Sequence, residues 1–303
     1  MKQTFYSNGK LLLTSEYLVL DGAKALALPT KFGQDLTVES GNHQEIQWTS
    51  FDYDHEIWFE STFPFQDIKE KVSFENQPEK NTLIRILHEA YLLNPKYLEA
   101  TSGYQIETQL GFPRKWGLGT SSTLINNIAK WLQIDAFTLL KNSFGGSGYD
   151  IACAQNDTAI LYRLLDGQPI VEKISFKPQC VSNLYFLYLN QKQSSQSAIA
   201  SYYAKSNRVE ELVPYFDSIT DDIFQKSDFI NLSLLLKKHE TKMSEVLSLT
   251  TIQDQLFPDF NGTIKSLGAW GGDFVLIVAA ENPTVYFKEK GYETILPYSE
   301  MIL

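Results

Sequence analysis

Three glycine-rich segments and one lysine supply the residue types that could do chemistry. Gly145–Asp150 is a glycine run that ends on a carboxylate and opens an apolar helix, and Gly117–Ser122 and Gly268–Asp273 are two further clusters. Lys10 directly follows a glycine near the start of the chain. Phosphoryl transfer needs positioning and neutralising charge, with a carboxylate near the attacking oxygen as an optional base. The combination therefore points to phosphoryl-transfer chemistry.

The Gly117–Ser122 segment runs into a predicted helix whose apolar residues Leu124, Ile128 and Leu132 share one stripe. A helix N-terminus presents unpaired amides and a partial positive charge, and glycine lets a phosphate approach the backbone closely. We therefore predict a phosphate loop with three hydroxyls that donate to phosphate or bind Mg²⁺. A tight turn with a helix cap is the alternative. The residues of the predicted loop are Gly117, Leu118, Gly119, Thr120, Ser121 and Ser122.

Lys10 and Asp150 are the candidate catalytic pair. The lysine would supply positive charge and lower the pKa of the acceptor, and the aspartate would orient or deprotonate it. Asp150 has a helix cap as its alternative role, because glycines precede it and an apolar helix follows. Three other cations lie in or beside glycine clusters, either as phosphate-binding groups or as solvated surface charges: Arg114, Lys115 and Lys265.

Several other classes of site do not fit the sequence. A Walker A loop needs a lysine before its last serine or threonine, and no such pattern occurs. A dinucleotide fingerprint needs a strand that leads straight into its glycines, whereas Pro113 to Trp116 intervene here and Ser122 replaces the third glycine. The four histidines show no zinc-ligand spacing, and no G-x-S-x-G elbow of a hydrolase is present.

The composition is that of an ordinary globular protein, and 303 residues are enough for two lobes that share a cleft. The net charge of −10 argues against nucleic acid, because a duplex binder needs a basic face, but local groups can still hold a nucleotide. Two cysteines give no disulfide framework, so we expect a cytoplasmic protein. The apolar run Leu11–Leu20 contains Glu16 and is too short to span a bilayer, which favours a core strand.

The hydrophobic pattern mixes strands and helices along the chain. Short β-rich runs predict strands within residues 1 to 60, and a helical pattern follows a predicted cap at Asn81. Strands are predicted between 158 and 189, helices from 194 to about 249, and a hairpin-like pair of strands around the third glycine cluster. We place the domain boundary after residue 165.

The order and spacing of these segments resemble the GHMP kinase superfamily over most of the chain. Asn8–Tyr17 resembles its first motif, Pro113–Ser122 its phosphate loop and Gly268–Asp273 its third motif. The run Gly146–Ala152 is most similar to phosphomevalonate kinase and mevalonate kinase. The resemblance implies a two-lobed α+β fold, with a ribosomal-protein-S5-like N-terminal lobe (1–165) and a ferredoxin-like C-terminal lobe (166–303).

The resemblance also implies where ligands bind. ATP phosphates would lie on the Gly117–Ser122 loop, with Mg²⁺ near Thr120 or Ser121. Lys10 and Asp150 would act at the acceptor. The implied acceptor contacts are Glu16, Ser147, Gly148, Gly268, Ala269, Trp270 and Gly271.

The sequence departs from the family pattern at four positions. Asn8 replaces a proline, Thr120 the first serine of the phosphate loop, and Trp270 a glycine of the third motif. The indole would line and narrow the acceptor pocket, or it packs as core between the lobes. Leu139 stands eleven residues before Asp150, where mevalonate kinase has a glutamate that binds Mg²⁺.

The leading hypothesis is an ATP-dependent kinase of a small anionic metabolite, mevalonate-like or phosphomevalonate-like, with a role in isoprenoid biosynthesis through the mevalonate pathway. A GHMP-fold binding or regulatory protein without turnover is the rival from another class, suggested by Trp270 and Leu139. A diphosphomevalonate decarboxylase would use the same fold and similar residues. The expected partners are ATP and the metabolite, without nucleic acid or membrane, in a monomer or homodimer.

Overall fold

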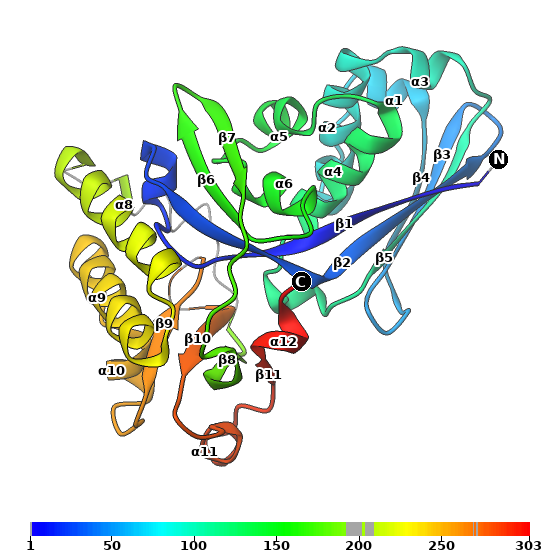
Figure 1. Ribbon diagram of the computed structural model, residues 1–303. Helices are drawn as coiled ribbons and strands as arrows, with labels where there is room; N and C mark the ends of the chain where they lie inside the picture. Colours follow the sequence, from blue (N-terminus) through cyan, green and yellow to red (C-terminus); the bar gives the residue numbers. More distant parts are fainter. Residues whose placement is uncertain (1, 192–201, 204–208, 269, 271) are drawn as a thin grey trace. The chain divides into compact units, whose positions relative to one another are not determined.

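The computed structural model describes residues 2–191, 202–203, 209–268, 270 and 272–303 (Figure 1). It divides into two compact units, each assembled from separate stretches of chain. Unit 1 comprises Met1–Gly9, Phe32–Arg114 and Leu118–Gln155; unit 2 comprises Lys10–Lys31, Lys115–Gly117 and Asn156–Leu303. The two lobes 1–165 and 166–303 stay a prediction.

Unit 1 contains a mixed sheet with helices packed on one face (Figure 1). Neighbouring strands follow the order β4-β3-β5-β2, and β1 also pairs with β2. Strands β3 and β5 run parallel to each other, whereas the pairs β3–β4 and β2–β5 are antiparallel. The strands are β1 (Gln3–Leu12), β2 (Ala25–Ser40), β3 (Glu45–Phe51), β4 (Ile57–Pro64) and β5 (Tyr104–Leu110), of which β1 and β2 extend into unit 2. The helices are α1 (Phe65–Lys69), α2 (Pro78–Leu93), α3 (Lys96–Glu99), α4 (Thr120–Leu132), α5 (Ala136–Ser143) and α6 (Tyr149–Ala154).

Alternating burial explains why one face of this sheet is covered. Along β5, Ile106, Thr108 and Leu110 are buried, and the residues between them face outward. This period of two is typical of a strand with one face against a core. Ile106 packs with apolar residues of α2, α4 and α5 in one cluster, which holds α4 against the sheet.

Unit 2 contains the first part of β2, which pairs with β6, and a second, antiparallel sheet of order β11-β8-β10-β9. Helix α9 packs against β9, and α8 packs against α9 and the 3₁₀ helix Leu18–Asp21. The strands are β6 (Ile160–Leu165), β7 (Gln168–Lys173), β8 (Leu184–Tyr188), β9 (Thr263–Ser266), β10 (Phe274–Val278) and β11 (Ile295–Pro297). The helices are α8 (Val209–Gln225), α9 (Phe229–Leu247), α10 (Ile252–Leu256), α11 (Thr284–Glu289) and α12 (Tyr298–Met301), and short 3₁₀ turns cover Arg114–Trp116 and Val181–Asn183.

Two local predictions were wrong. The strand predicted over Leu11–Leu20 ends at Leu12, and the chain then turns into the 3₁₀ helix. Leu18 is buried there as it would be in a strand, so hydrophobicity could not separate the two conformations. Asn81 does not cap α2, which starts at Pro78; its side chain instead bonds the backbone N–H and C=O of Phe74, at 2.7 and 2.8 Å.

Among the described residues, none of the helices combines the length and the apolarity that a bilayer crossing requires.

Candidate functional site

The predicted phosphate loop leads into helix α4, whose N-terminus is open. Gly119 is the N-cap at φ 97°, in the left-handed region, and no side chain caps the helix. The first backbone bond runs from Thr123 N–H to Gly119 O at 2.9 Å. In the part of the chain that the structure describes, the amides of Thr120, Ser121 and Ser122 therefore have no acceptor. Such amides are suited to an anion.

The three hydroxyls of the loop differ in their surroundings. Ser121 is exposed and Thr120 half-buried, so both side chains can reach a ligand or a metal ion. Ser122 is buried, and its hydroxyl donates to Gly119 O at 2.9 Å. Ser122 can therefore offer a phosphate its backbone N–H but not its hydroxyl proton. Leu118 is buried and anchors the loop in the core.

Lys10 lies against the first residue of the loop in unit 2. Its Nζ donates to the Gly117 carbonyl at 2.9 Å, across 107 positions of sequence. Gly117 has φ 68°, and a Cβ built on it would overlap the carboxylate of Asp273, the last residue of the third motif. Only glycine fits this position, because it combines a left-handed backbone with a close approach. Unit 2 thus brings together Lys10, the start of the phosphate loop and Asp273.

Aromatic packing fixes the residues just before Gly117. Trp116 meets the ring of Phe274 edge-on, with centroids 5.3 Å apart, and the Tyr188 hydroxyl donates to the Lys115 carbonyl at 3.0 Å. Phe274 and Tyr188 are paired across β10 and β8. The entry to the loop is therefore held on the second sheet.

Gly117→Ala tests the close approach. An alanine held in a left-handed conformation costs about 1–2 kcal/mol by itself, and here the Cβ must also displace the Asp273 carboxylate. We expect a larger loss of unfolding free energy than in the matched control Gly167→Ala, where φ is 73° and nothing lies within 4 Å of the built Cβ. Urea unfolding of both variants measures the difference. Equal losses at the two positions would contradict the crowding by Asp273.

Asp150 is the second residue of helix α6 in unit 1. Gly148, at φ 87°, is the N-cap, so Asp150 does not cap this helix and that alternative was wrong. The carboxylate is half-buried, and its Oδ1 accepts the N–H of Ile151 at 3.0 Å. Ser147 is half-buried and Gly148 buried directly before it. A catalytic role for Asp150 stays a prediction.

Trp270 lies in the apolar core of unit 2. Its side chain is 5% exposed and packs in a cluster that contains Tyr17, Phe216 and Met243. Its backbone N–H donates to the Tyr17 hydroxyl at 3.0 Å. This is core packing, within one unit, and it leaves little indole surface for an acceptor. Gly268, at φ 60°, precedes it, whereas Ala269 and Gly271 lie outside the described residues.

Glu16 and Lys265 are both buried and form an ion pair. The acceptor contact expected of Glu16 stays a prediction; inside unit 2 its carboxylate faces Lys265. Lys265 is neither a surface charge nor a phosphate-binding cation, since its ammonium also lies 3.5 Å from Glu240 Oε2. Arg114 is exposed and stacks on Trp58 at 4.6 Å.

Two observations bear on Mg²⁺. Within the described residues, no three His, Cys, Asp or Glu side chains gather closely enough to hold a metal ion. Leu139, at the position of the family's metal-binding glutamate, is fully buried in the core of unit 1. Mg²⁺ commonly binds few protein ligands and several phosphate or water oxygens. The accessible hydroxyls of Thr120 and Ser121, together with phosphate oxygens, are therefore suitable ligands for it.

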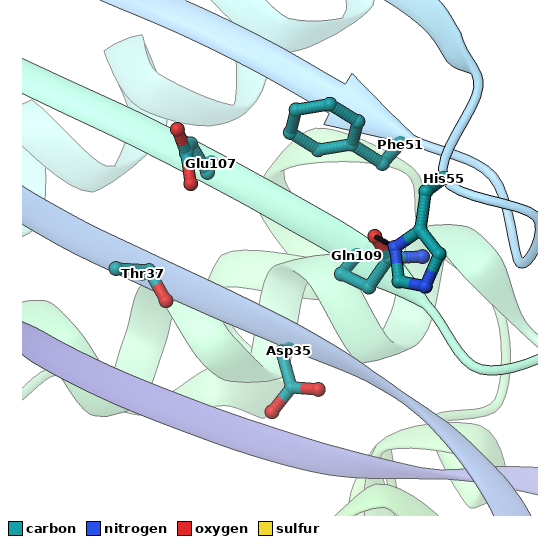
Figure 2. Close-up of a pocket in the computed structure, with 6 residues that line it drawn as sticks. All are labelled: Asp35, Thr37, Phe51, His55, Glu107 and Gln109. Atoms are coloured by element: carbon teal, nitrogen blue, oxygen red, sulfur yellow. Dashed lines mark hydrogen bonds between the residues drawn. The ribbon is translucent and has the colours of Figure 1, made fainter.

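A pocket of about 250 Å³ lies elsewhere in unit 1, on the sheet face that the helices leave open (Figure 2). His55 Nδ1 and Gln109 Oε1 meet across it at 2.9 Å. None of the residues predicted for the site lines it. The lining residues are Asp35, Thr37, Phe51, His55, Glu107 and Gln109.

No protein-family model matches the chain, and neither does any curated protein. Solved structures match over nearly its whole length. Mevalonate kinase of Methanococcus jannaschii is similar at a TM-score of 0.72 and 15% identity, covering 97% of this chain and 96% of that one. Streptococcus pneumoniae phosphomevalonate kinase, in complex with phosphomevalonate and AMPPNP, gives 0.70 and 14%, covering 99% and 98%. Lactococcus lactis galactokinase, complexed with galactose, gives 0.68 and 11%, covering 95% and 88%.

The chain has the GHMP kinase fold. The resemblance and the α+β fold class predicted from the glycine-rich motifs are thereby confirmed. Sequence reasoning missed the partners of these motifs, such as Glu240 and His239 beside Glu16, for which no local pattern exists.

Proposed function

We propose that this GHMP-fold chain is an ATP-dependent kinase that transfers the γ-phosphoryl group to a small anionic metabolite. The observation that carries the proposal is the hydrogen bond from the Lys10 ammonium to the Gly117 carbonyl, which places a cation at the start of the Gly117–Ser122 loop. The same loop leads into α4, whose first backbone amides are not capped by a side chain. Charge beside open amides is what a transferring phosphoryl group needs. The neighbours named for mevalonate and phosphomevalonate support an acceptor of that class.

In this proposal the chain's own groups have separate tasks. The amides of Thr120, Ser121 and Ser122 bind ATP phosphate oxygens, and the hydroxyl of Thr120 or Ser121 would hold Mg²⁺, which would neutralise phosphate charge. Lys10 stabilises negative charge on the group in transfer. Asp150 orients an acceptor hydroxyl and takes its proton; an acceptor phosphate needs only the orientation.

Nucleotide binding is the direct test. A ligand that binds only the native state stabilises it by about 2.7 kcal/mol at a hundredfold excess over its dissociation constant. Mg-AMPPNP should therefore raise the melting temperature, and Ser121→Ala should reduce the shift more than the control Ser122→Ala, whose hydroxyl bonds Gly119 internally. The absence of any shift at millimolar nucleotide, with and without Mg²⁺, would contradict both the kinase and the decarboxylase.

An acceptor screen that follows ATP consumption separates the remaining functions. A kinase consumes ATP in the presence of mevalonate or phosphomevalonate and yields a phosphorylated product. A decarboxylase also consumes ATP, but with a diphosphorylated acid, and it releases the phosphoryl group taken from ATP as phosphate, together with carbon dioxide from the acid. Nucleotide binding without turnover of any acceptor would favour the regulatory function.

A further inference from the structure

Unit 2 buries a cluster of four ionisable side chains. Glu16, His239, Glu240 and Lys265 are 1%, 0%, 3% and 0% exposed. The Lys265 ammonium pairs with Glu16 and lies 3.5 Å from Glu240 Oε2. Because desolvation offsets most of the attraction within a buried ion pair, stability alone does not explain such a cluster. The backbone segments that the cluster binds therefore indicate its role.

The cluster fixes the residue that precedes the third glycine motif. The N–H of Ser266 donates to Glu240 Oε2 at 3.1 Å, and its hydroxyl donates to Oε1 at 2.7 Å. The Ser266 carbonyl accepts from the Lys265 ammonium. Ser266 ends β9, two positions before Gly268. Both backbone polar groups of this residue thus bind side chains of the cluster.

The segment around Glu16 makes a second contact with the third glycine motif. Tyr17, next to Glu16, accepts the N–H of Trp270 at 3.0 Å, and its ring stacks on Tyr202 with centroids 5.6 Å apart. Two neighbouring residues therefore hold the chain on both sides of Gly268. Glu16 acts before it, through Lys265 and Ser266, and Tyr17 acts after it, through its bond with Trp270. The same segment follows the strand that carries Lys10.

This segment is strained. Ser15 and Tyr17 have φ of 61° and 63°, and the N–H of Leu18 reaches the Glu16 carbonyl at 2.7 Å in a γ-turn. Non-glycine residues keep such conformations only where their surroundings determine them, and they concentrate at functional positions. The cluster supplies that constraint, because His239 Nε2 accepts the Ser15 N–H at 2.9 Å.

Burial shifts the protonation equilibria of two members of the cluster. Burial and the Lys265 charge hold the pKa of His239 well below its usual value, so the ring is neutral and its Nε2 is an acceptor. Glu16 Oε2 lies 3.4 Å from that nitrogen, whose lone pair already accepts the Ser15 N–H. Burial raises the pKa of Glu16 from 4.5 to about 7, against the opposing effect of Lys265, so the carboxyl pairs with Lys265 in its ionised form above that pH and is neutral below it.

The charged groups around Glu16 come from two elements. α9 contributes His239 and Glu240, and β9 contributes Lys265. Helix α8 contributes Thr220, and three of its carboxylates are engaged elsewhere, Asp217 by Arg163, Asp221 by Lys24 and Asp222 by Lys226. Below the folded pKa of Glu16, its protonation leaves one carboxylate for one ammonium.

We propose that Glu16 is a positioning residue of the kinase reaction: with its cluster it holds the third glycine motif relative to the segment that follows Lys10, without touching the acceptor. The inference rests on the proposed kinase function. It predicts that disturbing Glu16 impairs use of the acceptor and leaves the nucleotide, which the start of α4 would bind, unaffected.

Glu16→Gln tests the positioning role when the kinetics are measured above the folded pKa of Glu16, because there it keeps the size of the side chain and removes the charge that pairs with Lys265. Misplacement of a reacting group by a remote change costs about 100-fold, so kcat/KM for the acceptor should fall by that order while the nucleotide dissociation constant stays unchanged. The control is Lys24→Met with Asp221→Asn, a part-exposed ion pair of 2.6 Å in the same unit that does not contact Ser266 or Trp270. The control should keep wild-type acceptor kinetics.

The pH dependence of melting tests the cluster without any turnover. Between about pH 5 and pH 7 the folded Glu16 keeps a proton that the unfolded chain has lost, so its contribution to stability declines as pH rises through that range and is gone above the folded pKa. The lowered pKa of His239 and the raised pKa of Glu240 act in both proteins, so the unfolding free energy of wild type minus that of Glu16→Gln should show this decline. An identical pH profile in the two proteins overturns the protonated cluster.

Two kinetic results overturn the positioning role. One is a folded Glu16→Gln with wild-type acceptor kinetics. The other is an equal loss of nucleotide affinity and acceptor kcat/KM, which general destabilisation would produce. A wild type that binds nucleotide but turns over no acceptor defeats the proposed function, and the positioning role with it, whereas the melting comparison still decides whether Glu16 holds the proton.

Discussion

Lys10→Met should lower turnover by about 10²–10³-fold, the usual cost of removing one group that stabilises charge in a transition state. Nucleotide binding should survive, because the amides at the start of α4 do not depend on the lysine side chain. The measurement is kcat beside the nucleotide dissociation constant. Lys31→Met is the matched control, since Lys31 also donates its ammonium to a backbone carbonyl, that of Ser299, in the same unit.

Asp150→Asn should show the same separation, with a loss of about 10²–10⁴-fold if the carboxylate acts as a base. Because Gly148 is the N-cap of α6, the change should cost little stability. Asp135 provides the contrast: it caps α5 by accepting the Thr138 N–H at 2.7 Å, so Asp135→Ala should cost about 1 kcal/mol and leave turnover intact. Full activity in both Lys10→Met and Asp150→Asn would remove the pair from the site.

The glycine-rich turns were predictable because their geometry is local. Gly119 and Gly148 each open a helix in a left-handed conformation, and that requirement is visible in the sequence as glycine before a helical pattern. These two glycine turns were therefore predicted correctly, and with them the fold class, although the local cap predicted at Asn81 was wrong.

The surroundings of Glu16, Lys265 and Trp270 were not predictable, because their partners are remote in sequence. Lys265 follows its partner Glu16 by 249 positions, and Trp270 follows Tyr17 by 253. A buried lysine has no periodic signature, and its charge alone favours the surface. The need for glycine at position 117 likewise comes from Asp273, which no local pattern indicates.

Trp270→Ala should cost about 3–5 kcal/mol of unfolding free energy, the usual price of a large-to-small change in a core. The indole packs among Tyr17, Phe216 and Met243 and leaves a cavity when it is removed. Urea unfolding measures the loss. Acceptor preference should stay unaltered in whatever protein remains folded, since little of the indole is exposed to a ligand.

Trp270→Phe is the control that separates packing from hydrogen bonding. In the described part of the chain the buried Nε1–H of Trp270 has no acceptor, so phenylalanine removes an unsatisfied donor while it keeps much of the ring volume. This variant should lose less than about 1.5 kcal/mol, as core changes that nearly conserve volume do. A Trp270→Ala protein that is as stable as wild type and phosphorylates a wider range of metabolites would contradict this core role. The indole would then line the acceptor pocket.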